Sequence, residues 1–255
     1  MNLKIIRDEI LNPDKGFYVI RKLYSEEEID HYRENCLDLI KKGPVINKRI
    51  NIKNMFDYVH KRSFDQNERT TRVYQFFENH KYSKTGFFFE KSKKIMDLIE
   101  DEWSKENKYY DEYRKTLQNY IIFTWYKPGF GKLPIHQDIK VQLKFPLLQS
   151  NVMLTQYNKD YYGGDFIFYS KNNKKYSVNN DLKLKKGDVL VFDKSLFHEV
   201  TKVESHSSIL SRCTVLINAR AKFKKEKLLF EKIKTNKIFN FLYSKISKNY
   251  KRDYN

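Results

Sequence analysis

The sequence predicts a mainly β protein with a helical buttress, an α+β chain whose core is built from short strands. Three observations support this prediction. Apolar residues at helical spacing gather before about residue 117, and from there on short β-like runs alternate with turn signals. A third is size, because 255 residues with 40% hydrophobic and 16% aromatic side chains can bury a sizeable core. No stretch rich in Pro, Gly or Ser divides the chain, so we expect one domain over residues 1–220 with its core at about 117–220.

The N-terminal part predicts one strand and two helices. Residues 16–24 form a short β-like run, and Ser25 with the three glutamates after it suits the start of a helix. That helix is expected over residues 26–41, ended by Gly43-Pro44. A second amphipathic helix is expected over residues 91–105. Residues 45–90 show poor periodicity, and no element is assigned to them.

The remaining part predicts short strands bounded by turns. The expected strands cover residues 120–126, 151–157, 165–169, 175–178, 188–192 and 213–219. The turn signals are Pro128-Gly129, Gly163-Gly164, Asn172-Asn173, Asn179-Asn180 and Lys186-Gly187. Helices first and many strands afterwards favour a β core packed against helices.

The formal net charge of +18 suggests anionic partners, although a codon bias toward Lys, Asn, Ile, Tyr and Phe accounts for part of it. Residues 221–255 hold 11 Lys or Arg against 3 Asp or Glu. We expect this tail to be a helical extension, either solvated and docked by an apolar stripe or in contact with nucleic acid or an anionic membrane surface.

Other global features exclude several classes. No apolar run approaches the ~18 residues of a membrane span, and the N-terminus lacks a secretory leader. Two cysteines, Cys36 and Cys213, cannot form a disulfide framework. We therefore expect a cytoplasmic protein.

A cluster of metal-binding residue types lies in the strand-rich part. His136 and Asp138 are two residues apart, so in an extended backbone they project from one face. His198, at the end of the run 187–197, is the best third ligand. Two histidines and one carboxylate leave three octahedral positions open, which suits non-haem Fe(II) better than a closed zinc site.

An anion-binding residue follows the distal histidine. Arg212 stands beside an apolar strand, where a guanidinium is costly unless it meets a carboxylate. Tyr126 ends a strand ten residues before His136 and offers a hydroxyl to the same anion. Period two places Thr214, Asn218 and Arg220 on the face of Arg212. Gly163-Gly164 is interpreted as a tight turn without direct chemistry.

Together these motifs resemble a known family. The ordered set is Tyr126-x-x-Gly129, His136-x-Asp138, Gly163-Gly164-Asp165-Phe166-x-Phe168, Gly187-Asp188-x-Leu190-x-Phe192, His198 and Arg212. It resembles the 2-oxoglutarate- and Fe(II)-dependent dioxygenases, especially their prolyl-4-hydroxylase-like branch. The resemblance covers about residues 117–220 and implies a double-stranded β-helix, or jelly-roll, core.

The resemblance also implies an activity and a site. His136, Asp138 and His198 would bind iron, and Arg212 would hold the distal carboxylate of 2-oxoglutarate, with Tyr126 and Thr214 assisting. Because the interval from His198 to Arg212 is long, Lys202 stays open as an alternative anchor. With Fe(II), 2-oxoglutarate and O₂, the implied reaction is hydroxylation, since related halogenases replace the carboxylate that Asp138 supplies.

The substrate is left more open, because fold does not choose it. The first expectation is hydroxylation of a small polar metabolite, such as a free amino acid or derivative. The alternatives are a protein or peptide (prolyl-type) hydroxylase, with residues 45–90 covering the substrate, and a nucleic-acid oxidative demethylase or nucleic-acid-binding module. Candidate substrate contacts outside the metal set are Arg72, Gln156, Asn218 and Arg220.

Overall fold

The computed structural model describes residues 2–41, 71–77, 87–126, 128–129, 131–139, 144–207 and 210–222. Its helices are α1 (Leu3–Leu11), α2 (Glu26–Lys41), α3 (Phe87–Glu106), α4 (Lys108–Lys115) and the single-turn π-helix η2 (Val178–Leu182). The strands before residue 160 are β1 (Phe17–Ile20), β2 (Thr71–Phe77), β3 (Leu117–Tyr126), β4 (Leu133–His136) and β5 (Leu148–Met153). Those after it are β6 (Tyr162–Gly163), β7 (Phe166–Tyr169), β8 (Lys175–Ser177), β9 (Val189–Asp193), β10 (Phe197–Val200), β11 (Val203–Glu204) and β12 (Cys213–Lys222).

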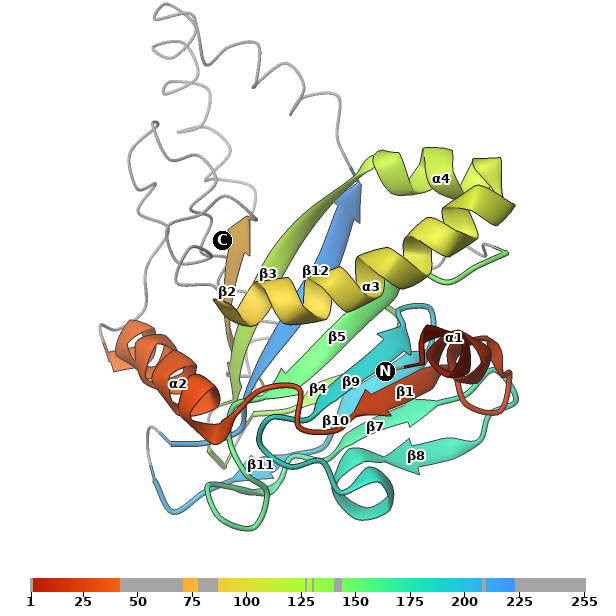
Figure 1. The fold of residues 1–255 in the computed structure, drawn as a ribbon. Coiled ribbons are helices and arrows are strands. Elements are labelled where there is room, and N and C mark those ends of the chain that lie inside the picture. The colour runs from red at the N-terminus through yellow and green to blue at the C-terminus, as the bar shows by residue number, and fades with distance from the viewer. Residues whose placement is uncertain are drawn as a thin grey trace, which may run out of the picture.

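Two antiparallel sheets form the body of the protein (Figure 1). The major sheet has six strands in the order β1-β9-β5-β12-β3-β2, and the minor sheet has four in the order β4-β10-β7-β8. A two-stranded ribbon, β11-β6, is separate from both. Apart from the consecutive pair β7 and β8, neighbours in these sheets are far apart in sequence, as in a jelly roll.

The two faces of the major sheet bury different side chains. One face packs Phe123, Val152 and Val215 against the helices, and α3 lies across it in Figure 1 with α4 beyond the ends of β3 and β12. The other face turns Met153 and Phe192 toward the minor sheet. The mainly β architecture with a helical buttress is therefore confirmed, and the interior between the sheets is where strand residues of both sheets meet.

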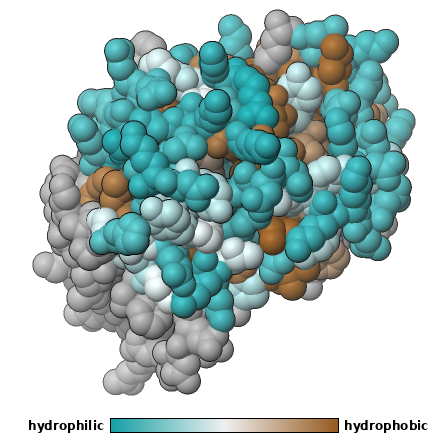
Figure 2. All heavy atoms as spheres, turned by 90° about the horizontal axis from the view of Figure 1, so that it is seen from below, coloured by the Kyte–Doolittle hydropathy of each residue, from teal (hydrophilic) through white to brown (hydrophobic). Residues whose placement is uncertain are grey.

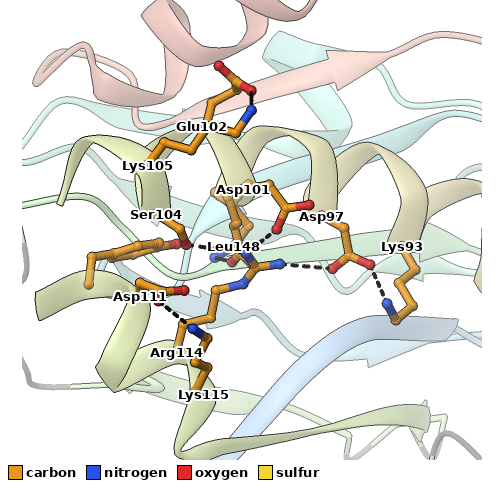
Figure 3. Close-up of polar contacts among 12 residues, drawn as sticks. Lys93, Asp97, Asp101, Glu102, Ser104, Lys105, Asp111, Arg114, Lys115 and Leu148 are labelled. Carbon is orange, nitrogen blue, oxygen red and sulfur yellow. Dashed lines mark hydrogen bonds and ion pairs between the residues drawn. The ribbon is translucent and has the colours of Figure 1, made fainter. Parts of the chain in front are cut away.

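A buried carboxylate fastens the helical layer to the major sheet. Glu100 of α3 is fully buried, and its Oε1 accepts a hydrogen bond of 3.0 Å from the backbone N–H of Leu148 in β5. Its Oε2 lies 3.1 Å from Nε of Arg114 in α4. Figure 3 shows the Arg114 guanidinium directed also toward Asp97 and Asp101 of α3. This network ties α3, α4 and β5 together.

Several predicted elements are confirmed. The helix over residues 26–41 has the expected bounds, and it begins with a capping box in which Ser25 Oγ accepts from the Glu28 N–H and Glu28 Oε2 accepts from the Ser25 N–H. The helix expected over residues 91–105 is longer, running from Phe87 to Glu106.

Other elements were placed wrongly or missed. The strand expected over residues 151–157 is β5, which lies at Leu148–Met153; every residue of β5 is buried, so no alternation marks its ends. The sequence reading assigned no helix to α1 or α4. In α1 the signal was present, since Asn2 caps the helix and Ile6 and Ile10 are buried one turn apart. The turn expected at Asn179-Asn180 is the π-helix.

The outer surface gives few hints of function. The face in Figure 2 is mostly hydrophilic, with apolar residues in separate small patches among the coloured atoms. No helix within the described ranges combines the length and apolarity needed to cross a membrane. The prediction of a helical tail at residues 221–255 falls almost entirely outside the described residues.

Candidate metal and anion site

The two sheets bring His136, Asp138 and His198 together. His136 ends β4 and His198 lies in β10, and the antiparallel pairing of these strands sets them directly opposite each other. Their ring centroids are 4.2 Å apart. Asp138 follows β4 by two residues, and one ligand atom from each of the three residues lies within 4.8 Å of the other two. The predicted cluster therefore exists as one spatial group.

Backbone carbonyls set the tautomer of both histidines. Nδ1 of His136 lies 2.8 Å from the Pro134 carbonyl oxygen, and Nδ1 of His198 lies 2.9 Å from that of Leu196. Because a carbonyl only accepts, each Nδ1 carries the proton and donates it. Each Nε2 is then a free lone pair, and the two lie 3.6 and 3.8 Å from the oxygens of Asp138. This is the arrangement that a metal ion requires of histidine ligands.

The charges of the cluster also suit a cation. Burial would raise the pKa of Asp138, but the adjacent His136 imidazole and the charges of His198 and Lys194 outweigh it and lower that pKa. Burial lowers the pKa of His198. For His136, burial acts downward, but Asp138 and the Pro134 carbonyl prevail and raise its pKa. An ionised carboxylate beside a neutral His198 is what metal binding needs.

Two of the three clustered residues are partly exposed. His198 is buried, His136 is half-buried, and the Asp138 side chain is 28% exposed. Gln149 of β5, a residue that sequence reasoning missed, donates from Nε2 to Oδ2 of Asp138 at 3.1 Å. Asp138 is thus held by a hydrogen bond from the major sheet while part of its side chain stays exposed.

The guanidinium of Arg212 is a buried cation in the interior that also holds the cluster. Arg212 immediately precedes β12 and is only 1% exposed, and its Nε and Nη2 have no hydrogen-bond partner among the described residues. Its guanidinium carbon lies 4.9 Å from the centre of the Tyr126 ring. Buried donor nitrogens without an acceptor are costly. We therefore interpret this position as a site for an anion that accepts their hydrogen bonds.

Two buried phenols accompany Arg212. Burial raises the pKa of Tyr126, and it raises the pKa of Tyr161 to about 12 against the opposing charge of Arg212. Both hydroxyls are therefore protonated and able to donate, and that of Tyr161 has no partner within the described residues. Sequence reasoning missed Tyr161, although it directly precedes Tyr162-Gly163-Gly164. Thr214, buried two residues after Arg212, lies opposite Met153 of the interior.

The glycine pair does more than turn the chain. Gly163 and Gly164 have φ of +58° and +55°, a region that favours glycine. A Cβ on Gly164 would lie 3.1 Å from Cδ of Arg212 and 2.6 Å from Cγ2 of Val203. The backbone of Gly164 thus lies against the Arg212 side chain, so the tight turn predicted here also borders the candidate anion site.

Of the remaining candidates, two lie away from the cluster and three have side chains outside the described ones. Lys202 is exposed and its Nζ lies 3.2 Å from Glu204, so Arg212 is the better candidate anchor. The side chain of Gln156 stabilises a turn, because its Oε1 accepts a hydrogen bond of 3.2 Å from the backbone N–H of Lys186. The side chains of Arg72, Asn218 and Arg220 lie outside the described ones. A register shift between Leu216 and Ala219 in the β12–β3 pair interrupts the alternation that placed the last two with Arg212.

Comparisons with known proteins agree with this description. A family model described as an oxygenase catalysing oxidative methylation of damaged DNA matches residues 91–196, less than half of the chain. No curated protein matches the sequence.

Solved structures show the same fold at low sequence identity. A prolyl-4-hydroxylase from Pseudomonas putida aligns with a TM-score of 0.56 and 11% identity, covering 86% of this chain and all of the other. A prolyl hydroxylase from Trichoplax adhaerens, solved with a fragment of hypoxia inducible factor, aligns at 0.53 and 13% identity, over 89% and 91% of the two chains. The α-ketoglutarate-dependent carbocyclase SnoK of nogalamycin biosynthesis aligns at 0.53 and 10%, over 85% of each.

These findings confirm the resemblance that the motifs predict, and the family description agrees with the predicted enzyme class. The chain has the jelly-roll fold of the Fe(II)- and 2-oxoglutarate-dependent oxygenases.

Proposed function

We propose that the protein is an Fe(II)- and 2-oxoglutarate-dependent oxygenase whose metal is held by His136, Asp138 and His198. The donor set fits, because two imidazole nitrogens and one carboxylate oxygen converge, with both Nε2 lone pairs unprotonated. When bound, Fe(II) and 2-oxoglutarate supply oxygen activation, in which 2-oxoglutarate and O₂ become succinate and CO₂ as a substrate C–H becomes C–OH.

The observation that carries the proposal is Arg212. Nε and Nη2 of this buried guanidinium have no partner among the described residues, and a buried charge of this kind favours an anion as its ligand. The distal carboxylate of 2-oxoglutarate matches its planar fork, which binds a carboxylate through two parallel hydrogen bonds. Tyr126 and Thr214 are proposed to assist, and the protonated hydroxyl of Tyr161 joins them as a further donor.

In this proposal the residues of the chain bind and orient. Arg212 fixes one end of the cosubstrate, and the three clustered residues fix the metal that its other end would chelate. The carbonyls of Pro134 and Leu196 hold the two imidazoles with Nε2 inward. Orientation of this kind is the main contribution a protein makes to cofactor-driven chemistry.

The first candidate substrate is a small polar metabolite, such as a free amino acid or derivative. The second is a damaged nucleobase, which the description of the matched family model favours. The exposure of Asp138 is compatible with either substrate. Peptides stay an alternative, since one structural relative is bound to a peptide fragment.

Succinate formation tests the proposal. The protein, with Fe(II) and 2-oxoglutarate, is exposed to O₂ in the presence of panels of amino acids, peptides and methylated oligonucleotides, with succinate and product mass as readouts. Wild type should form succinate, and Asp138→Ala should not. Undiminished turnover by Asp138→Ala would contradict the assignment. A mass gain of one oxygen, or loss of a methyl group from DNA, identifies the substrate class.

A further inference from the structure

Gln149 lies in the middle of the major sheet and faces the metal cluster. Its strand, β5, is hydrogen-bonded to β9 on one side and β12 on the other, and Gln149 pairs with Phe192 of β9. Gln149 is 1% exposed, whereas most long amides are on protein surfaces. A polar side chain at such a position needs a buried partner.

That partner is the carboxylate of Asp138. Gln149 donates from Nε2 to Oδ2 at 3.1 Å, and since a carboxylate only accepts, the amide nitrogen must be the group that faces it. Asp138 itself lies in the loop after β4, not in a strand. The hydrogen bond therefore connects a loop-borne carboxylate to a rigid strand, which restricts the rotation of the carboxylate plane.

This restriction matters for the number of oxygens that a metal would receive. A carboxylate binds metals through one oxygen or through both. A donor on Oδ2 occupies one of its lone pairs and leaves Oδ1, which lies 3.6 Å from Nε2 of His136, as the stronger ligand. A one-oxygen ligand beside two histidines keeps three octahedral positions open, whereas a chelating carboxylate would fill one of them.

We propose that Gln149 is a positioning residue that orients Asp138 to offer the metal a single oxygen. The inference rests on the proposed function, because it assumes that the cluster of His136, Asp138 and His198 binds a metal ion. Partners of metal ligands of this kind typically change metal affinity by about 10- to 100-fold when they are removed.

Cobalt(II) is the probe, because it binds such sites without reacting with oxygen as Fe(II) does. Co(II) is titrated into metal-free wild type, Gln149→Met and Gln149→Glu by calorimetry, and the visible absorption spectrum of each loaded protein is recorded. Gln149→Met keeps the length of the side chain and removes the donor, while Gln149→Glu keeps its shape. The melting temperature of each variant identifies any that fail to fold.

Ser150→Ala is the matched control. Ser150 neighbours Gln149 on β5 and is equally buried, but it alternates to the helical face. We expect a Co(II) Kd about 10- to 100-fold higher in Gln149→Met, a changed spectrum in both Gln149 variants, and wild-type values in Ser150→Ala.

The outcomes separate the two levels of the proposal. If wild type binds Co(II) and folded Gln149→Met shows the same Kd within twofold and the same spectrum, the role of Gln149 is refuted and the proposed function stands. If wild type does not bind Co(II), both are refuted. A spectrum that changes in Ser150→Ala as it does in Gln149→Met would also refute the role, because a general effect of the strand would then explain it.

Discussion

Replacing Arg212 with methionine should weaken 2-oxoglutarate binding and, at the same time, stabilise the empty protein. Among the described residues Nε and Nη2 of Arg212 have no hydrogen-bond partner, so a bound carboxylate gains two charge-assisted hydrogen bonds. At ~1.5–3 kcal/mol each, their loss amounts to about 3–6 kcal/mol. Since ~1.4 kcal/mol is tenfold in affinity, Kd should rise about 10²- to 10⁴-fold.

The effect on the empty protein has the opposite sign. An uncompensated buried charge is destabilising, and replacing buried ionic groups by apolar ones of similar volume often stabilises by ~1–4 kcal/mol. The cation–π contact with Tyr126, worth ~0.5–2 kcal/mol, reduces that gain. At ~2–4 °C per kcal/mol, the melting temperature should rise by a few degrees.

Calorimetric titration of 2-oxoglutarate into the Mn(II)-loaded protein gives the Kd, and scanning calorimetry of the metal-free protein gives the melting temperature. Lys202→Met is the control, because Lys202 is a basic residue of the same region, exposed and paired with Glu204. A Kd that changes less than tenfold in Arg212→Met, or equally in Lys202→Met, would refute the reasoning.

Three further predictions concern the stability of the fold and the packing around Arg212. Arg114→Met leaves Glu100 buried without its cation and should lower the free energy of unfolding in urea by ~3–5 kcal/mol; a loss below 1 kcal/mol contradicts the role of this network. Gly164→Ala places a Cβ 2.6 Å from Cγ2 of Val203 and at positive φ, so melting temperature and 2-oxoglutarate affinity should both fall; unchanged values in both disprove the contact. Burial raises the pKa of the Cys213 thiol to about 12, so at pH 8.5 (~the ordinary thiol pKa) iodoacetamide should label it only after unfolding in urea, by peptide mass mapping; rapid labelling of folded protein is the contrary result.

Local signals in the sequence predict much of the fold. Ser25 and Glu28 form the capping box that their spacing indicates, and β12 follows Arg212 with Cys213 and Val215 on the helical face. The bounds of β5 could not be predicted in the same way, because its six residues are all buried and carry no period-two pattern. Alternation in sequence arises only where one face meets water.

Residues of the candidate site were predicted where a local sequence signal exists and missed where none does. His136, Asp138 and His198 were predicted because residue type and strand spacing are local, and antiparallel pairing then set the histidines opposite each other. Gln149 and Tyr161 were missed because each matters only through a contact across the interior, with Asp138 and beside Arg212 respectively. No spacing in one sequence encodes such contacts.

The central claim is that one interior binds a metal at the three clustered residues and a dicarboxylate at Arg212. A crystal structure of the protein with Mn(II) and 2-oxoglutarate, in which manganese replaces the oxygen-sensitive iron, tests it most directly. We predict metal density within bonding distance of Nε2 of His136, Nε2 of His198 and Asp138, and the distal carboxylate on Nε and Nη2 of Arg212. Metal bound elsewhere, or 2-oxoglutarate that leaves Arg212 unpaired, would contradict the account.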